Sequence, residues 1–352
     1  MAEFINGRAY KQDELLTSGK YPVLRVGNFY TNDKWYYSDL ELPEKYYAEK
    51  GDLLYTWSAT FGPHIWIGPK VIYHYHIWKV ALKNLFEKDF ALQFFEADRV
   101  RLLNSTNGST MIHVTKKDME SKGILLPDVY EQRTIGELLK RVDDLIAATQ
   151  HRIDTLEHVK KALLQHVLDQ SWRFKGFTDH WKRHKISDIF RVTRGKVLPT
   201  SSVANQKSLA TPFPVYSSQT KHDGLLGYYH DYLYADAITW TTDGANAGMV
   251  KYRPQKFYST NVNGVLISTQ GYANTAVASI LNTIAWKYVS HVGNPKLMGK
   301  VMADISLELP SIPEQKALSS LLENLNNTIR TTNVKLSKIQ LLKSSLLQQL
   351  FI

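Results

Sequence analysis

The sequence contains no cysteine, so disulfide bonds and thiolate metal sites are excluded. It has no run of about 18 consecutive apolar residues, the length that a membrane-spanning helix requires. The first residues also lack the apolar core of a signal peptide. Together these absences predict a soluble, cytoplasmic protein that does not enter a membrane.

Two stretches are depleted in the residues that interrupt helices. Residues 131–170 contain no Tyr, Trp or Phe, no proline and one glycine, Gly136, and residues 314–352 contain neither glycine nor proline. Each stretch is therefore predicted to be one long helix. Roughly 38 residues at a rise of about 1.5 Å each would make a rod of about 57 Å.

Apolar residues recur along both stretches at alternating steps of three and four, with one additional step of four. A narrow seam of this kind predicts a coiled coil, with the other stretch as the nearest partner. The predicted seam comprises Leu138, Val142, Leu145, Ile153, Leu156 and Leu163 in the first stretch and Leu321, Leu325, Ile329, Leu336, Ile339 and Leu346 in the second.

The two stretches are copies of each other. Residues 126–168 return without a gap, 183 positions later, as residues 309–351, and each copy opens with the string Leu-Pro-x-x-x-Glu-Gln. A long helix that twice follows a globular stretch indicates a protein built from two copies of one structural unit. Such a chain can present two similar binding surfaces.

The net charge of +10 is concentrated outside the helices. Residues 131–170 hold six basic and seven acidic side chains and residues 314–352 hold five and two, so most of the excess lies on the globular stretches. A basic surface favours a polyanionic partner, because binding releases counterions from phosphates. A basic surface without a partner is the alternative.

The globular stretches are predicted to be mixed and strand-rich. Strands are expected at 21–26, 51–58, 65–67 and 71–80, and correspondingly at 213–216, 235–242, 249–252 and 257–266, with helices at 88–103 and 272–291. The predicted class is α+β, with globular domains at 1–130 and 173–312 and helical segments at 131–172 and 313–352. Gly7-Arg8 corresponds to Gly195-Lys196, so the first domain is expected to lack a counterpart of residues 181–189.

This order of domains resembles the specificity subunit of type I DNA restriction-modification systems. The strings that carry the resemblance start at Tyr21 (Tyr-Pro-Val-Leu-Arg-Val-Gly-Asn), Phe213 (Phe-Pro-Val-Tyr-Ser-Ser-Gln), Gly224 (Gly-Leu-Leu-Gly-Tyr-Tyr) and Thr241 (Thr-Thr-Asp-Gly-Ala-Asn-Ala-Gly). The doubled Leu-Pro-x-x-x-Glu-Gln helix is the most specific of them. The resemblance covers nearly the whole chain.

The resemblance implies two target recognition domains separated by two long antiparallel coiled-coil helices, in a pseudo-two-fold repeat. Each domain would read one half of a split double-stranded DNA target, and the helices would set the gap. The subunit would be non-catalytic and need no cofactor of its own. It would dock two methyltransferase subunits and, through them, the restriction subunits, where S-adenosylmethionine, ATP and magnesium are expected to bind.

Candidate DNA-binding residues are polar or aromatic groups at predicted strand ends and loops, where side chains can reach base edges or phosphates. Turn formation, packing and simple exposure are the alternative roles for each of them. The candidates are Arg25, Asn28, Trp57, Ser58, His76 and His113 in the first half and Ser217, Ser218, Gln219, Lys221, Thr241, Thr242, Asp243, Asn261 and Lys296 in the second. A metal site is not expected at His74 and His76, because no third ligand follows in register.

The sequence lacks the motifs of the enzymes that act on DNA. It has no Gly-x-x-x-x-Gly-Lys-Ser/Thr loop, no Gly-x-Gly-x-x-Gly, no Asn/Asp-Pro-Pro-Tyr and no His-Glu-x-x-His. A stand-alone nuclease or methyltransferase is therefore the weaker alternative. A coiled-coil adaptor that does not bind DNA is the other.

Overall fold

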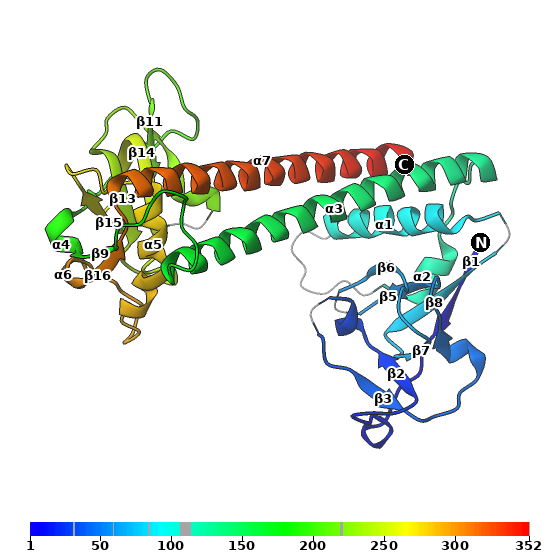
Figure 1. Cartoon of the computed structure of the whole chain (residues 1–352). Helices are drawn as coiled ribbons and strands as arrows, with labels where there is room; N and C mark the ends of the chain where they lie inside the picture. The colour runs from blue at the N-terminus through cyan, green and yellow to red at the C-terminus, as the bar shows by residue number, and fades with distance from the viewer. Residues whose placement is uncertain (31, 59, 84, 106–113, 219–220, 352) are drawn as a thin grey trace. The chain divides into compact units, whose positions relative to one another are not determined.

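The computed structural model describes residues 1–352 except 31, 59, 84, 106–113, 219–220 and 352. It divides into two compact units. Unit 1 comprises Met1–Gln150 and Val334–Ile352, and unit 2 comprises His151–Asn333. Each unit consists of a strand-rich globular part and half of each long helix (Figure 1).

Unit 1 holds two four-stranded sheets, with strand orders β1-β8-β5-β6 and β3-β2-β7-β4. Its strands are β1 (Ala2–Asn6), β2 (Tyr21–Leu24), β3 (Tyr36–Ser38), β4 (Tyr47–Ala48), β5 (Leu53–Thr56), β6 (Gly62–Ile65), β7 (Val71–Tyr73) and β8 (Ile77–Leu82). Helices α1 (Lys88–Ser105) and α2 (Lys116–Ser121) follow, and 3-10 turns lie at η1 (Gln12–Glu14), η2 (Val26–Phe29) and η3 (Glu44–Tyr46). An aromatic core of Phe4, Tyr55, Trp78 and Phe95 joins the first sheet to α1.

Unit 2 holds one six-stranded sheet, with the order β10-β15-β13-β14-β11-β12, and a separate pair, β16-β9. Its strands are β9 (Lys182–Lys185), β10 (Arg191–Arg194), β11 (Phe213–Tyr216), β12 (Leu225–Tyr229), β13 (Tyr234–Thr241), β14 (Val250–Ser259), β15 (Asn263–Ile267) and β16 (Ser306–Leu309). Its short helices are α4 (Ile186–Ile189), α5 (Thr275–Ala285), α6 (Gly299–Asp304), η4 (Thr200–Ser202), η5 (Lys221–Gly224) and η6 (Trp286–Tyr288).

The globular parts share one strand plan. In unit 2 the single strand β14 pairs with β13 along one part and with β11 along another. In unit 1 the same two roles fall to separate strands, β6 and β7, which pair with β5 and β2. One unbroken strand therefore gives unit 2 a single sheet, while a break gives unit 1 two sheets.

Two strand predictions were wrong. The predicted strand 71–80 is broken at a turn, Tyr75-His76, which passes the chain from the β7 sheet to the β8 sheet. The predicted turn between 252 and 257 lies inside β14, and the turn falls instead at Asn261-Val262. Local apolar pattern does not distinguish a long strand from two short ones.

The long helices are α3 (Val129–Leu168) and α7 (Ile312–Leu350). In unit 1 the first half of α3 lies beside the last half of α7, where Leu139 and Leu347 share a core and Lys343 pairs with Asp143 at 2.5 Å. In unit 2 the end of α3 packs on the start of α7 through Val167 and Leu318. The helices are therefore antiparallel (Figure 1).

The seam follows strict heptads, which corrects part of the predicted set. Leu138 and Leu145 are exposed, at 46% and 43%, and the adjacent Leu139 and Ile146 face the partner helix. In the second helix Leu322 is fully buried while the predicted Leu321 is only half-buried. The other predicted seam positions are buried or half-buried: Val142, Ile153, Leu156, Leu163, Leu325, Ile329, Leu336, Ile339 and Leu346. When Leu139, Ile146 and Leu322 replace the three misassigned leucines, the seam positions alternate between steps of three and four without the additional step of four.

Two buried glutamines explain why each helix opens with the same string. Gln132 donates to the carbonyls of Pro127 (2.9 Å) and Leu85 (2.8 Å). Gln315 donates to the carbonyl of Pro310 (2.8 Å), and its own amide oxygen accepts from Asn274 (2.9 Å). Each glutamine ties the proline turn to the helix, which satisfies buried carbonyl groups. The predicted α+β class and the two-copy plan are confirmed.

Candidate nucleic-acid interface

In unit 1 three strand ends meet at one edge, and the candidates Arg25, Trp57 and His76 lie there. Strands β2 and β7 are parallel, so both end on the same side, and the His74 amide donates to the Leu24 carbonyl (2.9 Å). Strand β5 is antiparallel to β8, so the Trp57 amide donates to the His76 carbonyl (3.2 Å). We call the surface formed by Arg25, Trp57, Ser58, His74, Tyr75 and His76 edge 1.

Unit 2 repeats this arrangement with different side chains. The Thr260 amide donates to the Tyr216 carbonyl (2.9 Å), and the Thr242 amide donates to the Val262 carbonyl (3.0 Å). Asp243 forms a backbone bridge with Lys296. We call the surface formed by Arg194, Lys196, Ser217, Ser218, Thr241, Thr242, Asp243, Asn261 and Lys296 edge 2.

Each edge is completed by a glycine followed by a basic residue. A Cβ on Gly7 would lie 2.4 Å from the His74 carbonyl oxygen, and one on Gly195 would lie 2.1 Å from that of Thr260. Only glycine permits this approach, which holds Arg8 beside His74 and Lys196 beside Thr260. These cations were not among the predicted site residues. The repeated Gly-basic pair was the signal in the sequence that could have identified them.

Edge 1 is aromatic and rich in imidazole. The Trp57 ring is half-buried, lies 5.7 Å from the Trp78 ring and donates from Nε1 to the Tyr75 carbonyl (2.9 Å). Burial lowers the pKa of His74 to about 4, with smaller contributions from His76 and Arg25, and burial also lowers the pKa of His76. Neutral imidazoles at edge 1 can donate or accept hydrogen bonds without adding charge.

Arg25 and Asn28 have different roles. The Asn28 amide oxygen accepts from the Arg25 amide (3.0 Å), and its nitrogen donates to the carbonyls of Asn32 (3.1 Å) and Lys34 (3.2 Å). Asn28 therefore forms the turn at η2. The Arg25 guanidinium lies 5.2 Å from the centre of the Tyr36 ring and forms no ion pair with a described residue. Its hydrogen-bond donors remain available to a ligand.

At edge 2 the predicted threonines are mainly structural. Thr241 and Thr242 are only 7% and 6% exposed, and the Thr242 hydroxyl lies 2.7 Å from an Asp243 carboxylate oxygen and 2.9 Å from the Val262 carbonyl oxygen. The Ser217 hydroxyl accepts from Thr260 (3.1 Å), and the adjacent Ser218 is half-buried. The Thr242 and Ser217 hydroxyls therefore shape the edge through hydrogen bonds within the chain.

The accessible cations of edge 2 are Arg194, Lys196 and Lys296, which are exposed. Arg194 donates to the carbonyl of the half-buried Asn261 (2.5 Å), so it fixes the turn between β14 and β15. His113 and Gln219 lie outside the described residues, as does the side chain of Lys221, whose backbone begins η5.

A hollow of about 490 Å³ adjoins edge 2. Arg194, Trp240, Asp243 and Lys300 are among the residues that line it. The lining of this hollow thus combines the Trp240 ring with charged side chains of both signs.

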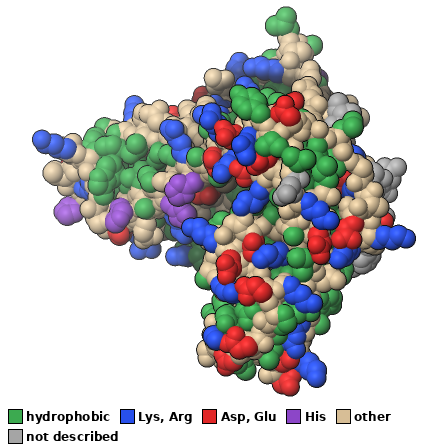
Figure 2. Space-filling view, turned by 90° about the vertical axis from the view of Figure 1, so that its right-hand side faces the viewer, with side chains coloured by type: hydrophobic (Ala, Val, Ile, Leu, Met, Phe, Trp, Pro, Cys, Tyr) green, Lys and Arg blue, Asp and Glu red, His purple; other side chains and the backbone are tan. Residues whose placement is uncertain are grey.

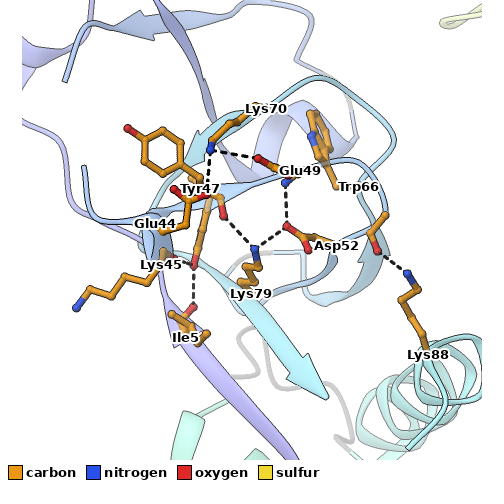
Figure 3. A network of polar contacts seen from close by, with 12 residues as sticks. Ile5, Glu44, Lys45, Tyr47, Glu49, Asp52, Trp66, Lys70, Lys79 and Lys88 are labelled. Carbon is orange, nitrogen blue, oxygen red and sulfur yellow. Dashed lines mark hydrogen bonds and ion pairs between the residues drawn. The ribbon is translucent and has the colours of Figure 1, made fainter. Parts of the chain in front are cut away.

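Many lysines of unit 1 are engaged away from the edge. Lys70 pairs with Glu44 (2.9 Å) and Glu49 (3.1 Å), and Lys79 pairs with Asp52 (2.7 Å), which ties residues 44–52 to β7 and β8 (Figure 3). On the face drawn in Figure 2, basic side chains are interspersed with acidic ones. The formal charge of unit 1 is thus partly neutralised by its own carboxylates, which increases the importance of the few cations at edge 1.

The chain belongs to the family described as type I restriction modification DNA specificity domain, whose model matches residues 1–158 and 178–341. The two matched segments contain the two globular parts and most of the two long helices.

The chain is similar to two putative type I specificity subunits of Mycoplasma pneumoniae. One, an N-terminal portion, is 37% identical over 145 residues, which cover 40% of this chain and 76% of that one. The other is 33% identical over 162 residues, or 45% of this chain and 44% of that one. The fold matches a crystal structure of a type I specificity subunit from M. genitalium with a TM-score of 0.72 and 15% identity, over 100% of this chain and 94% of that one.

Among the described residues no helix is long and apolar enough to cross a membrane.

Proposed function

We propose that this chain is the DNA-reading specificity subunit of a type I restriction-modification complex, and that edges 1 and 2 each read one half of a split target. The observation that carries the proposal is the duplicated edge. The same strand ends and the same close-packed glycine, Gly7 or Gly195, form two surfaces whose side chains differ. One scaffold with two unlike surfaces suits two unlike half-sites.

The chemistry of each edge supports DNA as the ligand. Lys196, Lys296 and Arg194 at edge 2 can contact phosphates, and the half-buried Asn261 can address a base. At edge 1 the Arg25 guanidinium offers paired donors that suit guanine, and the neutral His76 can donate or accept. Phosphate contacts position the protein, whereas these base contacts would select the sequence.

Helices α3 and α7 are the spacer in this proposal. Each has about 40 residues and runs through both units, and they associate through an uninterrupted heptad seam. Their length would set the number of unread base pairs, since target halves on one face of a duplex are separated by about 34–36 Å per turn.

In this proposal the other subunits of the complex supply the catalytic activities and bind the cofactors. Two methyltransferase subunits would dock on it and bind S-adenosylmethionine, and restriction subunits that use ATP and magnesium would join through them. The chain itself would contribute sequence recognition and no reacting group. The chain is expected to bind double-stranded DNA in the cytoplasm.

Salt dependence of duplex binding tests the DNA-reading role. A protein that makes six to ten phosphate contacts loses about 10³–10⁵ in affinity between 50 and 200 mM salt. We expect a steep log–log slope for the purified chain or its complex with methyltransferase subunits. Affinity that does not change over this range would favour a coiled-coil adaptor.

A paired insertion tests the spacer. One heptad added to α3 after Arg152 and one added to α7 after Lys335 preserve the seam on both helices. Methylated sites mapped in cells that also express the methyltransferase subunits should then show a longer gap and unchanged half-sites. Altered half-sites with an unaltered gap would refute the spacer role.

A further inference from the structure

The hollow of about 490 Å³ in unit 2 lies where unit 1 is filled by aromatic rings. The strand registers give the equivalent positions. Tyr55 of β5 pairs with Trp78 of β8, and Trp240 of β13 pairs with Gly264 of β15. Gly264 therefore occupies the position of Trp78, and unit 2 has no side chain where unit 1 has an indole.

Two more rings of unit 1 are replaced by smaller side chains on the same face. Val192 occupies the position of Phe4, since each pairs two positions further along the neighbouring strand. Thr242 occupies the position of Trp57, as their equivalent backbone hydrogen bonds show. In unit 1 the Trp78 ring lies 5.4 Å from the Phe4 ring and 5.7 Å from the Trp57 ring. These three rings fill the space that is open in unit 2.

Helix α6 widens the same space. It corresponds to α2 at the repeat distance of 183, so Gly299 and Ala303 occupy the positions of Lys116 and Glu120. In unit 1 the Glu120 carboxylate accepts from the Phe4 amide (3.3 Å) and lies 3.5 Å from the Lys116 ammonium. Smaller side chains on two strands, one strand end and one helix therefore open the hollow together.

The polar groups of the lining suit a ligand that has a hydrogen-bond donor and a negative charge. The Asp243 carboxylate is half-buried and forms no ion pair with a described residue. Its Oδ2 lies 2.7 Å from the Thr242 hydroxyl, and no described residue donates to its Oδ1. Lys300 and Arg194 are exposed at the rim, and neither forms an ion pair with a described residue. One acceptor and two cations are thus available beside an apolar space.

A nucleotide matches these groups and the place of the hollow. A carboxylate accepts from the exocyclic amino group of cytosine or adenine, and cations at a rim contact phosphate. The volume lies within the range of sites for small ligands. The hollow is also continuous with edge 2, because Arg194, Thr242 and Asp243 belong to both. A nucleotide of DNA held at edge 2 would therefore be close to it.

We propose that the hollow of unit 2 binds one unstacked nucleotide whose base carries an exocyclic amino group. The base enters the hollow, its amino group donates to Asp243, and its phosphate lies at Lys300 and Arg194. The nucleotide is either an unpaired one within bound DNA, in which case the proposal rests on the DNA-reading function above, or a free one. Because aromatic rings fill the equivalent space of unit 1, the site belongs to unit 2 alone.

Two free nucleotides that differ in the amino group are the first probes. Titrated into the full chain and followed by calorimetry, deoxycytidine monophosphate should bind saturably. Deoxyuridine monophosphate has a carbonyl oxygen in place of the amino group, so it should bind at least about tenfold more weakly. Asp243→Asn should reduce this preference to less than about threefold. Lys300→Gln should weaken the monophosphate about threefold and leave deoxycytidine, which has no phosphate, unaffected.

A substitution that fills the hollow locates the site. Ala303→Phe places a ring in the hollow from α6 and should abolish nucleotide binding. Val301→Phe is the matched control, because Val301 lies on the same helix, is 41% exposed and is not part of the lining. Asp243→Asn changes no volume, so it tests the site even where Ala303→Phe disturbs α6.

A duplex with one unpaired cytosine tests DNA as the source. The target found by mapping methylated sites is made with the extra base at successive positions of both halves. An unpaired base is already unstacked, so little energy is spent on extracting it. One position in one half should bind about tenfold more tightly than the uninterrupted duplex, and Ala303→Phe should remove this gain.

The outcomes separate this proposal from the DNA-reading function. Absence of saturable binding by deoxycytidine monophosphate, equal binding of the two nucleotides, or unchanged binding to the Ala303→Phe variant would overturn the hollow as a nucleotide site. Steep salt dependence of duplex binding would leave the DNA-reading function standing in each of these cases. Nucleotide binding without a gain at any duplex position would support the site with a free nucleotide as its ligand. A gain in both halves would contradict a site confined to unit 2.

Discussion

At edge 1 the turn that joins β7 to β8 carries His74, Tyr75 and His76, whereas the corresponding turn from β14 to β15 at edge 2 carries Thr260, Asn261 and Val262. The backbone hydrogen bonds that hold the two turns are equivalent. The scaffold is thus preserved while the surface that faces a ligand changes from aromatic and imidazole groups to small polar ones.

The basic residues differ in the same way. Arg8 at edge 1 is held by Glu14 through two hydrogen bonds (3.0 and 2.7 Å), whereas Lys196 at the equivalent place is exposed and forms no ion pair with a described residue. Edge 2 therefore presents exposed cations that form no ion pair with a described residue, and edge 1 presents oriented planar groups. Phosphate contacts are expected to contribute more to binding by unit 2 than by unit 1.

The largest expected effect concerns the centres of the two cores, where Trp240 and Tyr55 hold equivalent strand positions. Trp240 is 1% exposed and donates from Nε1 to the Leu297 carbonyl (2.9 Å). Trp240→Ala should lower the free energy of unfolding by about 3–5 kcal/mol, through cavity formation and loss of the hydrogen bond. Urea denaturation measures the loss.

The control is Tyr55→Phe. The Tyr55 hydroxyl is buried and has no hydrogen-bond partner among the described residues, so its removal should cost less than about 1 kcal/mol. A larger loss of stability for Tyr55→Phe than for Trp240→Ala would contradict the equivalent positions assigned to Tyr55 and Trp240 at the centres of the two cores.

The two helix starts offer a matched pair of substitutions. Gln132→Ala and Gln315→Ala each remove a buried amide and leave proline-turn carbonyls unpaired, so each should cost about 2–3 kcal/mol. The Gln132 amide makes three hydrogen bonds and the Gln315 amide two, so the first loss should be the greater. Gln165→Ala, at an exposed site on α3, should change stability by less than about 0.5 kcal/mol. Equal results for all three would show that the shared string does not anchor the helices.

Comparison of these elements with the sequence shows what could be predicted. The helices, the repeat and the α+β class follow from missing glycine and proline and from periodicity. The seam was misassigned at Leu138, Leu145 and Leu321 because each has an apolar neighbour, Leu139, Ile146 or Leu322, one position later. Periodicity alone does not decide which member of such a pair faces the partner helix.

The edges were harder to predict because they depend on pairing between distant strands. Arg25, Trp57 and Asn261 were identified as strand-end groups, but the roles of Arg8, Arg194 and Lys196 required the close approach at Gly7 and Gly195. Strand β13 also contains a register shift near Asp236, whose φ is +46°. An alignment of β13 with β5 from the sequence alone therefore pairs each residue with a neighbour of its true structural counterpart. A bulge of this kind leaves no clear pattern in one sequence.

A smaller effect is expected for single cations at the edges. Lys196→Ala should reduce the slope of log affinity against log salt by about one, as expected for one lost phosphate contact. Arg8→Ala should change the slope less, because Glu14 already neutralises Arg8. Lys70→Ala, in the network of Figure 3, is the control that should leave the slope unchanged. A greater change for Arg8 than for Lys196 would reverse the assigned difference between the edges.

A last expected effect is a dependence of stability on pH that is specific to unit 1. Burial lowers the pKa of both His64 and His74 to about 4, below the value of about 6.5 for an unfolded chain. The unfolded state therefore binds more protons between these values, and stability falls as the pH drops from about 6.5 toward 4. Each histidine contributes at most about 1.4 kcal/mol per pH unit, and partial exposure reduces this.

Urea denaturation between pH 7 and 5 measures the effect. His64→Asn should make the dependence shallower, since one of the two buried imidazoles is removed. A stability that stays constant over this range would contradict the burial of these rings.

The central claim is that each edge reads its own half of one DNA target. Mapping methylated adenines across the genome, in cells that express the chain with its methyltransferase subunits, tests it most directly. Arg25→Ala should relax base preference in one half of the target and Asn261→Ala in the other, with the gap unchanged in both. Relaxation of the same half by both substitutions, or of both halves by either one, would contradict the account.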